Sequence, residues 1–270
     1  RRAHERLFED LNLESLALAR ALIMEGRAFA GERKLRSPGE LLADKEAVRV
    51  RGELDRYVRR GAHKLRRALE VFGIDVGGKV CLDVGASTGG FTDVLLRAGA
   101  RRVYAVDVGY NLLDYRLRAD ARVTVMERTN ARFLRPEDFP ERPVFGATDV
   151  SFISLKAVLP AALAVLDGPE RRFVALVKPQ FEAPKEDVGE KGVVRDPRVH
   201  ARVLEEITAF VPTLGWKCVG LDFSPIRGPE GNIEFLLEIV PEQAAEEVLH
   251  KYAISDTIRR AYDKFIKMPG

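Results

Sequence analysis

The sequence has 270 residues, 46% of them hydrophobic and 31% charged, which is typical of a soluble globular protein with one α/β domain of ordinary size and a small appendage. No uninterrupted apolar stretch reaches the roughly 18 residues of a transmembrane helix, and the charged N-terminus does not resemble a signal peptide. Cys81 and Cys218 lie far apart, without a C-x-x-C pattern or a histidine cluster. We therefore expect a cytoplasmic protein with neither a disulfide framework nor a metal site.

The basic charge is concentrated near the N-terminus. Residues 1–70 contain 17 Lys and Arg against 12 Asp and Glu, whereas the remaining 200 residues contain 27 against 29. A helix is predicted over 11–24, with Gly26 as its stop, and the short apolar pieces up to Arg51 predict a helix pair leading into a compact sheet. Such asymmetry is expected of a module that binds a polyanion, although solvated charge on a small domain gives the same count.

After a helix predicted over 62–72, the chain alternates strand and helix, which predicts βαβ units and a parallel sheet. Two later apolar runs are joined by a loop without a helix, so they should pair antiparallel. The sequence thus predicts an α/β fold with a mostly parallel sheet and an antiparallel last strand. The predicted strands lie near 79–84, 102–107, 122–126, 144–149, 173–177, 216–223 and 233–240.

A glycine-rich turn follows the first of these strands. The run from Lys79 to Val84 is apolar, residues 85–90 form a turn that needs close backbone approach, and residues 91–97 open a helix. Asp107 ends the next strand, where a carboxylate can bind a ribose. These features outline a nucleotide-cofactor site.

Three chemistries could use this turn. An NAD-type loop presents bare N–H groups to a pyrophosphate, and Asp83, two residues before the first glycine, works against that. The same carboxylate suits S-adenosylmethionine, which carries a sulfonium and an ammonium but no phosphate. Residues 85–89 also match the G-x-S-x-G elbow of serine hydrolases, with Ser87 as nucleophile. However, the downstream histidines, His200 and His250, have no obvious strand-end position, so we rank methyltransferase first, hydrolase second and dehydrogenase third.

Charged residues mark the ends of later strands. Asp149 ends one apolar run and Lys178 ends the next, so both should lie at the carboxyl edge of the sheet, where open α/β proteins bind ligands. Glu234 opens a strand of opposite direction, which brings it to the same edge. Charged residues commonly stand where strands enter solvent. Lys178, however, precedes Pro179 in a stiff turn that would hold its amine near the crevice, where it could help to deprotonate a hydroxyl.

In combination these segments resemble the TlyA proteins, which are often labelled haemolysins and are similar to FtsJ-type ribose methyltransferases. The resemblance covers nearly the whole chain. It implies a Rossmann-like class I methyltransferase sheet and S-adenosylmethionine-dependent 2′-O-methylation of ribosomal RNA, at cytidines in known members. The segments that carry it are 83–93, 103–110, 127–132, 149–155, 176–182 and 231–235, including Asp83-Val84-Gly85-Ala86-Ser87-Thr88-Gly89-Gly90-Phe91, Asp149-Val150-Ser151-Phe152 and Lys178-Pro179-Gln180-Phe181.

The resemblance also implies the site residues. The Lys-Asp-Lys-Glu tetrad of the family corresponds to Lys64, Asp149, Lys178 and Glu234, of which Lys64 is placed by the resemblance alone. In the implied in-line displacement Lys178 activates the ribose 2′-hydroxyl or accepts its proton, Asp149 holds that amine, and the other two orient the ribose. The cofactor is expected to contact Gly85, Ser87, Thr88, Gly89, Gly90 and Phe91 of the turn, with Asp83 at its amino-acid end, Asp107 at its ribose and Asn130 at its adenine.

Residues 1–56 resemble the alpha-L RNA-binding motif shared with a small-subunit ribosomal protein and some pseudouridine synthases. A linker is expected over 57–63 and an FtsJ-like methyltransferase domain over 64–270. The implied partner is ribosomal RNA or a ribosomal subunit, with no membrane and no metal. The cations expected to contact folded RNA are Arg20, Arg27, Arg33, Lys34 and Arg36.

Two rival functions follow from the same resemblance. The haemolysin label suggests a membrane-lytic protein, but every apolar run is accounted for by a strand or a core helix, which leaves no amphipathic segment free to insert. A catalytically silent RNA-binding protein is the alternative, and the intact tetrad argues against it.

Overall fold

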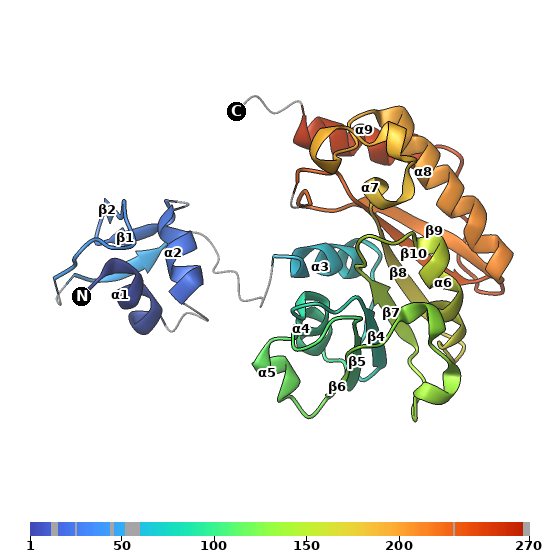
Figure 1. Cartoon of the computed structure of the whole chain (residues 1–270), viewed down its shortest axis with the longest axis horizontal. Helices are drawn as coiled ribbons and strands as arrows, with labels where there is room; N and C mark the ends of the chain where they lie inside the picture. The colour runs from blue at the N-terminus through green and yellow to red at the C-terminus, as the bar shows by residue number, and fades with distance from the viewer. Residues whose placement is uncertain (12–15, 25, 44–45, 52–59, 229, 267–270) are drawn as a thin grey trace. The chain divides into compact units, whose positions relative to one another are not determined.

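The computed structural model describes residues 1–11, 16–24, 26–43, 46–51, 60–228 and 230–266. The chain divides into two compact units, Arg1–Val58 and Arg59–Gly270, each drawn with its own helices and sheet in Figure 1. Residues 57–59 of the predicted linker lie outside the described residues. Residues 60 and 61 precede the first helix of the second unit, and residues 62 and 63 are its first two residues.

The N-terminal unit consists of two helices followed by a small antiparallel sheet, as the sequence predicts. Its core contains the fully buried Leu7, Leu22, Ile23 and Leu35. The helix predicted over 11–24 is described over 16–24, since residues 12–15 lie outside the described part. The elements are α1 (Ala3–Asp10), α2 (Leu16–Met24), β1 (Ala28–Ala30), β2 (Arg33–Lys34) and β3 (Val48–Val50), with strand order β2-β1-β3.

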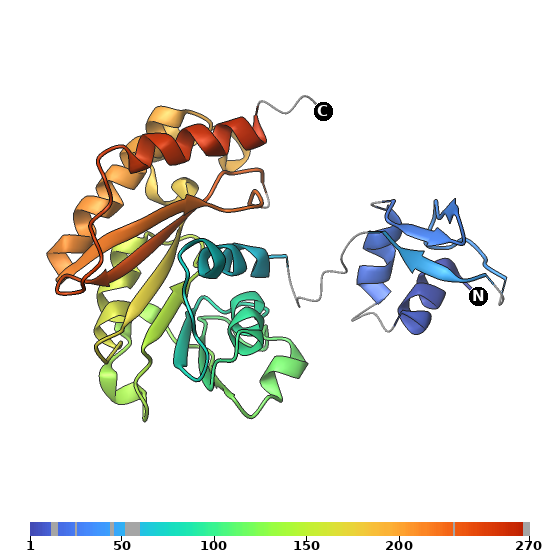
Figure 2. The same cartoon turned by 180° about the vertical axis from the view of Figure 1, so that it is seen from behind.

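The C-terminal unit is built on a seven-stranded sheet of order β6-β5-β4-β7-β8-β10-β9. The pairs among β4 to β8 are parallel, and β10 is antiparallel to both β8 and β9, which confirms the predicted mostly parallel sheet and its antiparallel last strand. Figure 2 shows this sheet from behind. The strands are β4 (Val80–Val84), β5 (Arg102–Val106), β6 (Val123–Met126), β7 (Phe145–Thr148), β8 (Arg172–Val177), β9 (Trp216–Phe223) and β10 (Phe235–Pro241).

Helices cover both faces of this sheet (Figure 1), with α3 and α4 on one face and α6 and α8 on the other. Because side chains alternate along a strand, Val80, Leu82 and Val84 enter the core beneath α6, α8 and α9, whereas Asp83 points towards α4. The helices are α3 (Ala62–Val71), α4 (Gly90–Arg97), α5 (Tyr115–Arg118), α6 (Leu155–Ala164), α7 (Pro179–Glu182), α8 (Pro197–Phe210) and α9 (Ala253–Phe265), with 3-10 turns at Ala131–Phe133, Pro136–Asp138, Lys185–Asp187, Glu190–Gly192 and Val211–Leu214.

α8 and α9 are the last two α-helices of the described chain. Asp196 is the N-cap of α8, and its side chain accepts a hydrogen bond from the backbone N–H of Arg198. Pro197 occupies the first position of the helix. α9 has no counterpart among the predicted elements; it packs on α8 and β9 and contributes Ile258 and Ala261 to the main core. Within the described ranges, no helix is long and apolar enough to cross a membrane.

Candidate active site

A cavity of about 720 Å³ opens in the C-terminal unit at the carboxyl edge of the parallel strands. Its volume lies in the range of roughly 300–1,000 Å³ that is typical of small-ligand sites. The turn after β4 forms one wall, and the residues that follow β7 and β8 form another. The lining includes Gly85, Ser87, Thr88, Gly90, Phe91, Asp149, Lys178, Asn232 and Glu234, together with Lys64 from α3.

Two glycines give the turn its shape. Gly85 has φ +83°, and a Cβ there would lie 2.7 Å from the carbonyl oxygen of Asp149, so only glycine allows the turn to pass this close to the end of β7. Gly89 has φ +101° at the N-cap of α4, where a Cβ would overlap the Leu117 side chain. The turn therefore presents backbone to the cavity, and α4 begins at its end.

The structure brings together the four residues of the predicted tetrad, although they come from α3 and from the segments that follow β7, follow β8 and precede β10. Lys178 Nζ lies 2.5 Å from Asp149 Oδ1, and Lys64 Nζ lies 2.6 Å from Glu234 Oε2. The two pairs are linked because Lys64 Nζ is also 3.9 Å from Asp149 Oδ2. Two cations and two carboxylates thus form one connected cluster, in which the four formal charges balance.

The tetrad is sheltered from solvent. The exposed fractions of the side chains are 7% for Lys64, 1% for Glu234, 10% for Lys178 and 20% for Asp149. Gln180 Nε2 lies 3.4 Å from Glu234 Oε1 and can donate a weak hydrogen bond to it. Charges this far out of water interact strongly, so the lysine amines are held in fixed positions rather than free to rotate.

Two residues that the sequence analysis missed support Lys178. Lys178 Nζ donates a hydrogen bond to Ser151 Oγ at 3.0 Å, so this amine contacts both a carboxylate and a hydroxyl. Glu182, at the end of α7, accepts hydrogen bonds from Ser154 Oγ (2.6 Å) and from the backbone N–H of Leu155 (2.7 Å). Burial raises the pKa of Glu182, and its two bonds tie the segment after β7 to the turn that bears Lys178.

An exposed aromatic ring stands at the edge of the cavity. Phe152 is 90% exposed and has φ +63°, a conformation that a bulky residue adopts only when its surroundings require it. Its ring centroid lies 5.0 Å from that of Phe181, which in turn lies 5.9 Å from Lys178 Nζ. An apolar surface is therefore available beside the amine.

Asp83 is fully buried and does not line the cavity. Its Oδ2 accepts a 2.7 Å hydrogen bond from Thr92 Oγ1 of α4, while its Oδ1 has no hydrogen-bond partner in the part of the chain that the structure describes. Burial raises the pKa of Asp83 to about 7, against a smaller opposing effect of the Thr92 hydrogen bond. Its predicted contact with the cofactor stays a prediction.

Asp107 and Asn130 lie outside the cavity lining as well. The Asp107 carboxylate accepts hydrogen bonds from the backbone N–H groups of Ser87 (2.8 Å) and Gly109 (2.7 Å), so it holds the glycine-rich turn against the end of β5. Asn130 is exposed and caps the 3-10 turn at 131–133 by accepting from the N–H of Arg132 (3.1 Å). Both stay predicted cofactor contacts.

The hydrolase alternative lacks a histidine base in the described cavity lining. Ser87 lines the cavity with φ +49°, but none of the four histidines lines it among the described residues. His200 is buried in α8, where its Nδ1 lies 3.1 Å from Tyr262 Oη, and burial lowers its pKa to about 4. Among the described residues, Ser87 therefore has no histidine with which to form a Ser-His-Asp triad.

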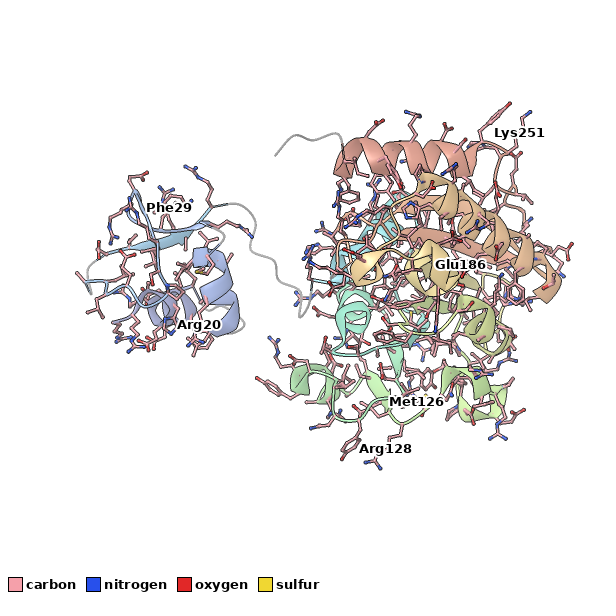
Figure 3. All side chains as sticks on the ribbon, turned by 45° about the horizontal axis from the view of Figure 1, so that its top comes forward. Arg20, Phe29, Met126, Arg128, Glu186 and Lys251 are labelled. Atoms are coloured by element: carbon pink, nitrogen blue, oxygen red, sulfur yellow. The ribbon has the colours of Figure 1, made fainter. Side chains whose placement is uncertain are left out.

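The cations predicted to contact RNA lie on the N-terminal unit, where Arg20 is exposed on α2 (Figure 3). Lys34 and Arg36 are also exposed. Arg27 Nε donates to the carbonyl of Arg51 at 3.3 Å. Arg33 forms ion pairs with Glu40 and Glu46, and the hydrogen bond from Arg33 to Glu40 lowers the pKa of that carboxyl.

The same unit carries a basic aromatic contact that the sequence analysis did not identify. The guanidinium groups of Arg49 and Arg51 lie 5.3 and 5.2 Å from the ring centroid of Phe29 on β1, which Figure 3 labels.

No group of three or more His, Cys, Asp or Glu side chains capable of holding a metal occurs within the residues that the structure describes.

Comparison with known proteins identifies the family. The model of the FtsJ-like methyltransferase family matches residues 57–239. The chain belongs to this family. It is 50% identical over 227 residues to "Putative rRNA methyltransferase YqxC" of Bacillus subtilis, an alignment that covers 84% of this chain and 80% of the relative.

The resemblance to the TlyA proteins is confirmed by a second relative. The Mycobacterium tuberculosis protein named 16S/23S rRNA (cytidine-2′-O)-methyltransferase TlyA is 46% identical over 83% of each chain. A solved structure described as "Putative hemolysin from Streptococcus thermophilus" superposes with a TM-score of 0.78 at 42% identity, covering 99% of this chain and 97% of that one. This methyltransferase therefore belongs to the TlyA group, in which the names haemolysin and methyltransferase occur side by side.

Proposed function

We propose that this methyltransferase transfers a methyl group from S-adenosylmethionine to the ribose 2′-hydroxyl of a cytidine in ribosomal RNA. The observation that carries the proposal is the tetrad, which places the Lys178 amine in the wall of a cavity that also contains the glycine-rich turn. The cytidine and the ribosomal RNA come from the activity named for the M. tuberculosis relative.

The cavity suits the cofactor in size and in lining. Its volume of about 720 Å³ accommodates a nucleoside with an amino-acid tail, and the backbone of Gly85 and Gly90 lines it. The expected contacts are this turn, with Ser87, Thr88, Gly89 and Phe91, and further out Asp83, Asp107 and Asn130. When bound, S-adenosylmethionine supplies a sulfonium-activated methyl group that leaves sulfur as its bond to the attacking oxygen forms.

Lys178, in its neutral amine form, is proposed to take the proton of the 2′-hydroxyl and to become the ammonium that pairs with Asp149. Asp149 and Ser151 contact its Nζ at 2.5 and 3.0 Å. These two contacts use the two N–H groups of the neutral amine and leave its lone pair for the substrate in the cavity. Lys64 and Glu234 are proposed to position the ribose from the opposite side of Asp149. A proton acceptor held in this way contributes roughly 10²–10⁴-fold to the rate of such a reaction.

The aromatic edge of the cavity supports an RNA substrate. A nucleotide whose ribose reaches Lys178 must leave its base stack, and an exposed ring offers a surface on which an unstacked base can lie. Phe152, beside Phe181, is placed for this role. A Phe152→Ala variant should raise the KM for RNA and leave the Kd for S-adenosylmethionine unchanged.

Residues 1–56 are proposed to form the RNA-binding domain, and residues 64–270 the catalytic one. Arg20, Lys34 and Arg36, as exposed cations, together with Arg27 and Arg33, would contact phosphates of folded RNA. Since the proposed substrate is ribosomal RNA, the proposed site of action is the cytoplasm.

The experiment is a methyl-transfer assay with the full chain, deuterated-methyl S-adenosylmethionine and each purified ribosomal subunit, followed by digestion to nucleosides and mass spectrometry. We expect labelled 2′-O-methylcytidine with wild type and with Lys156→Met, an exposed α6 lysine paired with Glu206. The Lys178→Met variant should give at most about a hundredth of the wild-type label at early times. Label on a base rather than a ribose, or on neither subunit, would refute the proposal.

A further inference from the structure

The rim of the cavity carries charge that the tetrad does not balance. Beyond the tetrad, the lining contains three cations, Arg60, Lys191 and Arg227, and one carboxylate, Glu230. Since the four charges of the tetrad cancel, the described lining as a whole has an excess of two positive charges. A rim of this sign favours an anionic ligand.

Lys191 is held at this rim by a strained loop. Its backbone is left-handed, with φ +59° and ψ +20°, which costs a non-glycine residue about 1–2 kcal/mol. The bonds from Gly192 N to the Gly189 carbonyl (3.1 Å) and from Gly189 N to the Val193 carbonyl (3.1 Å) enclose it in a tight turn. Strain of this kind persists where the surroundings impose it, commonly at ligand sites.

A buried side chain imposes the conformation. Asn232 is only 2% exposed, its Nδ2 donates to the Gly192 carbonyl (2.9 Å), and its Oδ1 accepts from the N–H of Val194 (3.0 Å). Asn232 stands two residues before Glu234 of the tetrad. The Lys191 loop is therefore tied to the same segment that positions the catalytic cluster.

Two of the three rim cations, Lys191 and Arg227, form no ion pair with a carboxylate in the described part of the chain. Lys191 has no ion pair there, and the neighbouring Glu190 does not line the cavity. The Arg227 guanidinium donates to the carbonyl oxygen of Phe265 and lies 5.3 Å from the centroid of that ring, which fixes its position without cancelling its charge.

The charge of the methyl donor excludes it as the main reason for this rim, because S-adenosylmethionine is itself a cation overall. An RNA chain, in contrast, carries a negative phosphate on each side of the reacting ribose. We infer that Lys191 and Arg227 bind the backbone phosphates that flank the target nucleotide, and so hold its ribose at the tetrad. This inference rests on the proposed function, and it assigns two substrate-binding residues of the C-terminal unit.

The test compares Lys191→Gln with Lys185→Gln in the full chain. Lys185 is a matched control, since it is an exposed lysine of the same α7–α8 connection that does not line the cavity. kcat/KM is measured from 50 to 200 mM salt with the ribosomal subunit that wild type methylates as substrate. The Kd for S-adenosylmethionine is determined by calorimetry. Thermal unfolding confirms that each variant is folded.

We expect Lys191→Gln to lower kcat/KM about tenfold at low salt, as for one lost phosphate contact, and to make the log–log salt slope shallower by about 0.7–0.9. Adding Arg227→Gln should reduce the slope again by a similar amount, Lys191→Arg should restore it, and Lys185→Gln should match wild type. The Kd for S-adenosylmethionine should stay unchanged in all of them.

Two outcomes would overturn the inference while leaving the proposed function intact. If wild type methylates a subunit and Lys191→Gln does so with the same kcat/KM and salt slope, the rim cations do not contact phosphate. If Lys191→Gln instead weakens S-adenosylmethionine binding with an unchanged salt slope, the lysine binds the carboxylate of the donor. A wild type that methylates neither subunit would refute the proposed function and this inference together.

Discussion

Replacing Glu234 by glutamine tests the buried ion pair that connects α3 to the sheet. The Lys64 and Glu234 side chains are 7% and 1% exposed, and their charged atoms lie 2.6 Å apart. Glutamine preserves the shape of the side chain and removes its charge, so the ammonium of Lys64 stays buried without its nearest partner. Removal of one member of such a pair costs about 3–5 kcal/mol.

The expected cost is at the lower end of that range. Asp149 Oδ2 remains 3.9 Å from Lys64 Nζ and compensates part of the lost attraction, so we expect Glu234→Gln to reduce the free energy of unfolding by about 3 kcal/mol. A Lys64→Met variant should cost a similar amount. The double variant leaves neither charge behind, and its cost should fall below the sum of the singles by about 2 kcal/mol.

The assay is urea unfolding followed by the fluorescence of Trp216, the only tryptophan of the sequence, which is 7% exposed on β9 and therefore reports on the C-terminal unit. Lys156 and Glu206 form a matched control pair, 2.9 Å apart with side chains 40% and 48% exposed, worth at most about 1 kcal/mol. If the Lys64 and Glu234 single variants each cost under about 1 kcal/mol and their effects add, the buried pair is not an energetic unit.

Three further predictions concern the turn and two buried titratable groups. Gly85→Ala should destabilise the C-terminal unit by about 2–3 kcal/mol in urea unfolding and displace Asp149, since its Cβ would lie 2.7 Å from the Asp149 carbonyl oxygen. The control Gly73→Ala, at φ +62° with nothing within 4 Å of the added Cβ, should cost only about 1 kcal/mol. Equal costs for the two variants would contradict this prediction. Burial lowers the pKa of His200 to about 4, so stability should fall by up to about 3 kcal/mol as pH drops from 6.5 towards 4, and His200→Phe should lose that dependence in pH-resolved melting. Burial raises the pKa of Asp83 to about 7, so stability should be lost, by up to about 4 kcal/mol, as pH rises from about 4 to 7; an Asp83→Asn variant with the same pH profile as wild type would disprove this.

The strands of the C-terminal unit could be predicted because each is an apolar run bounded by charged or turn residues. The same logic places Asp149 and Lys178 together, since the carboxyl ends of adjacent parallel strands share one edge of the sheet. The antiparallel direction of β10 follows from the absence of a helix between the last two runs, and it brings Glu234 to that edge.

Other features depend on contacts that local sequence does not encode. Lys64 reaches Glu234 across 170 positions of the chain, so spacing cannot place it, and the family resemblance was needed. α9 was not predicted, and its N-cap, Tyr252, makes no side-chain capping bond. Lys191 resembles any surface lysine until the bonds from Asn232 show that its loop is fixed.

Asp83 shows how strand alternation modifies an expectation drawn from a motif. Its position beside the glycine turn suggests contact with the cofactor, but adjacent residues of a strand face opposite sides of the sheet. Asp83 therefore points to Thr92 beneath α4, while the following residues turn into the cavity. The sequence shows the proximity of a carboxylate to the turn but not the direction of its side chain.

A single-turnover comparison of wild type with Lys178→Met shows whether Lys178 accepts the proton of the ribose 2′-hydroxyl. Both proteins are saturated with tritiated S-adenosylmethionine and with the ribosomal subunit that wild type methylates, so that only the transfer step is measured. We predict a rate lower by about 10²–10⁴-fold in the variant, with the Kd values for cofactor and subunit within about threefold of wild type. Transfer by Lys178→Met at the wild-type rate would contradict the assignment of Lys178 as the proton acceptor.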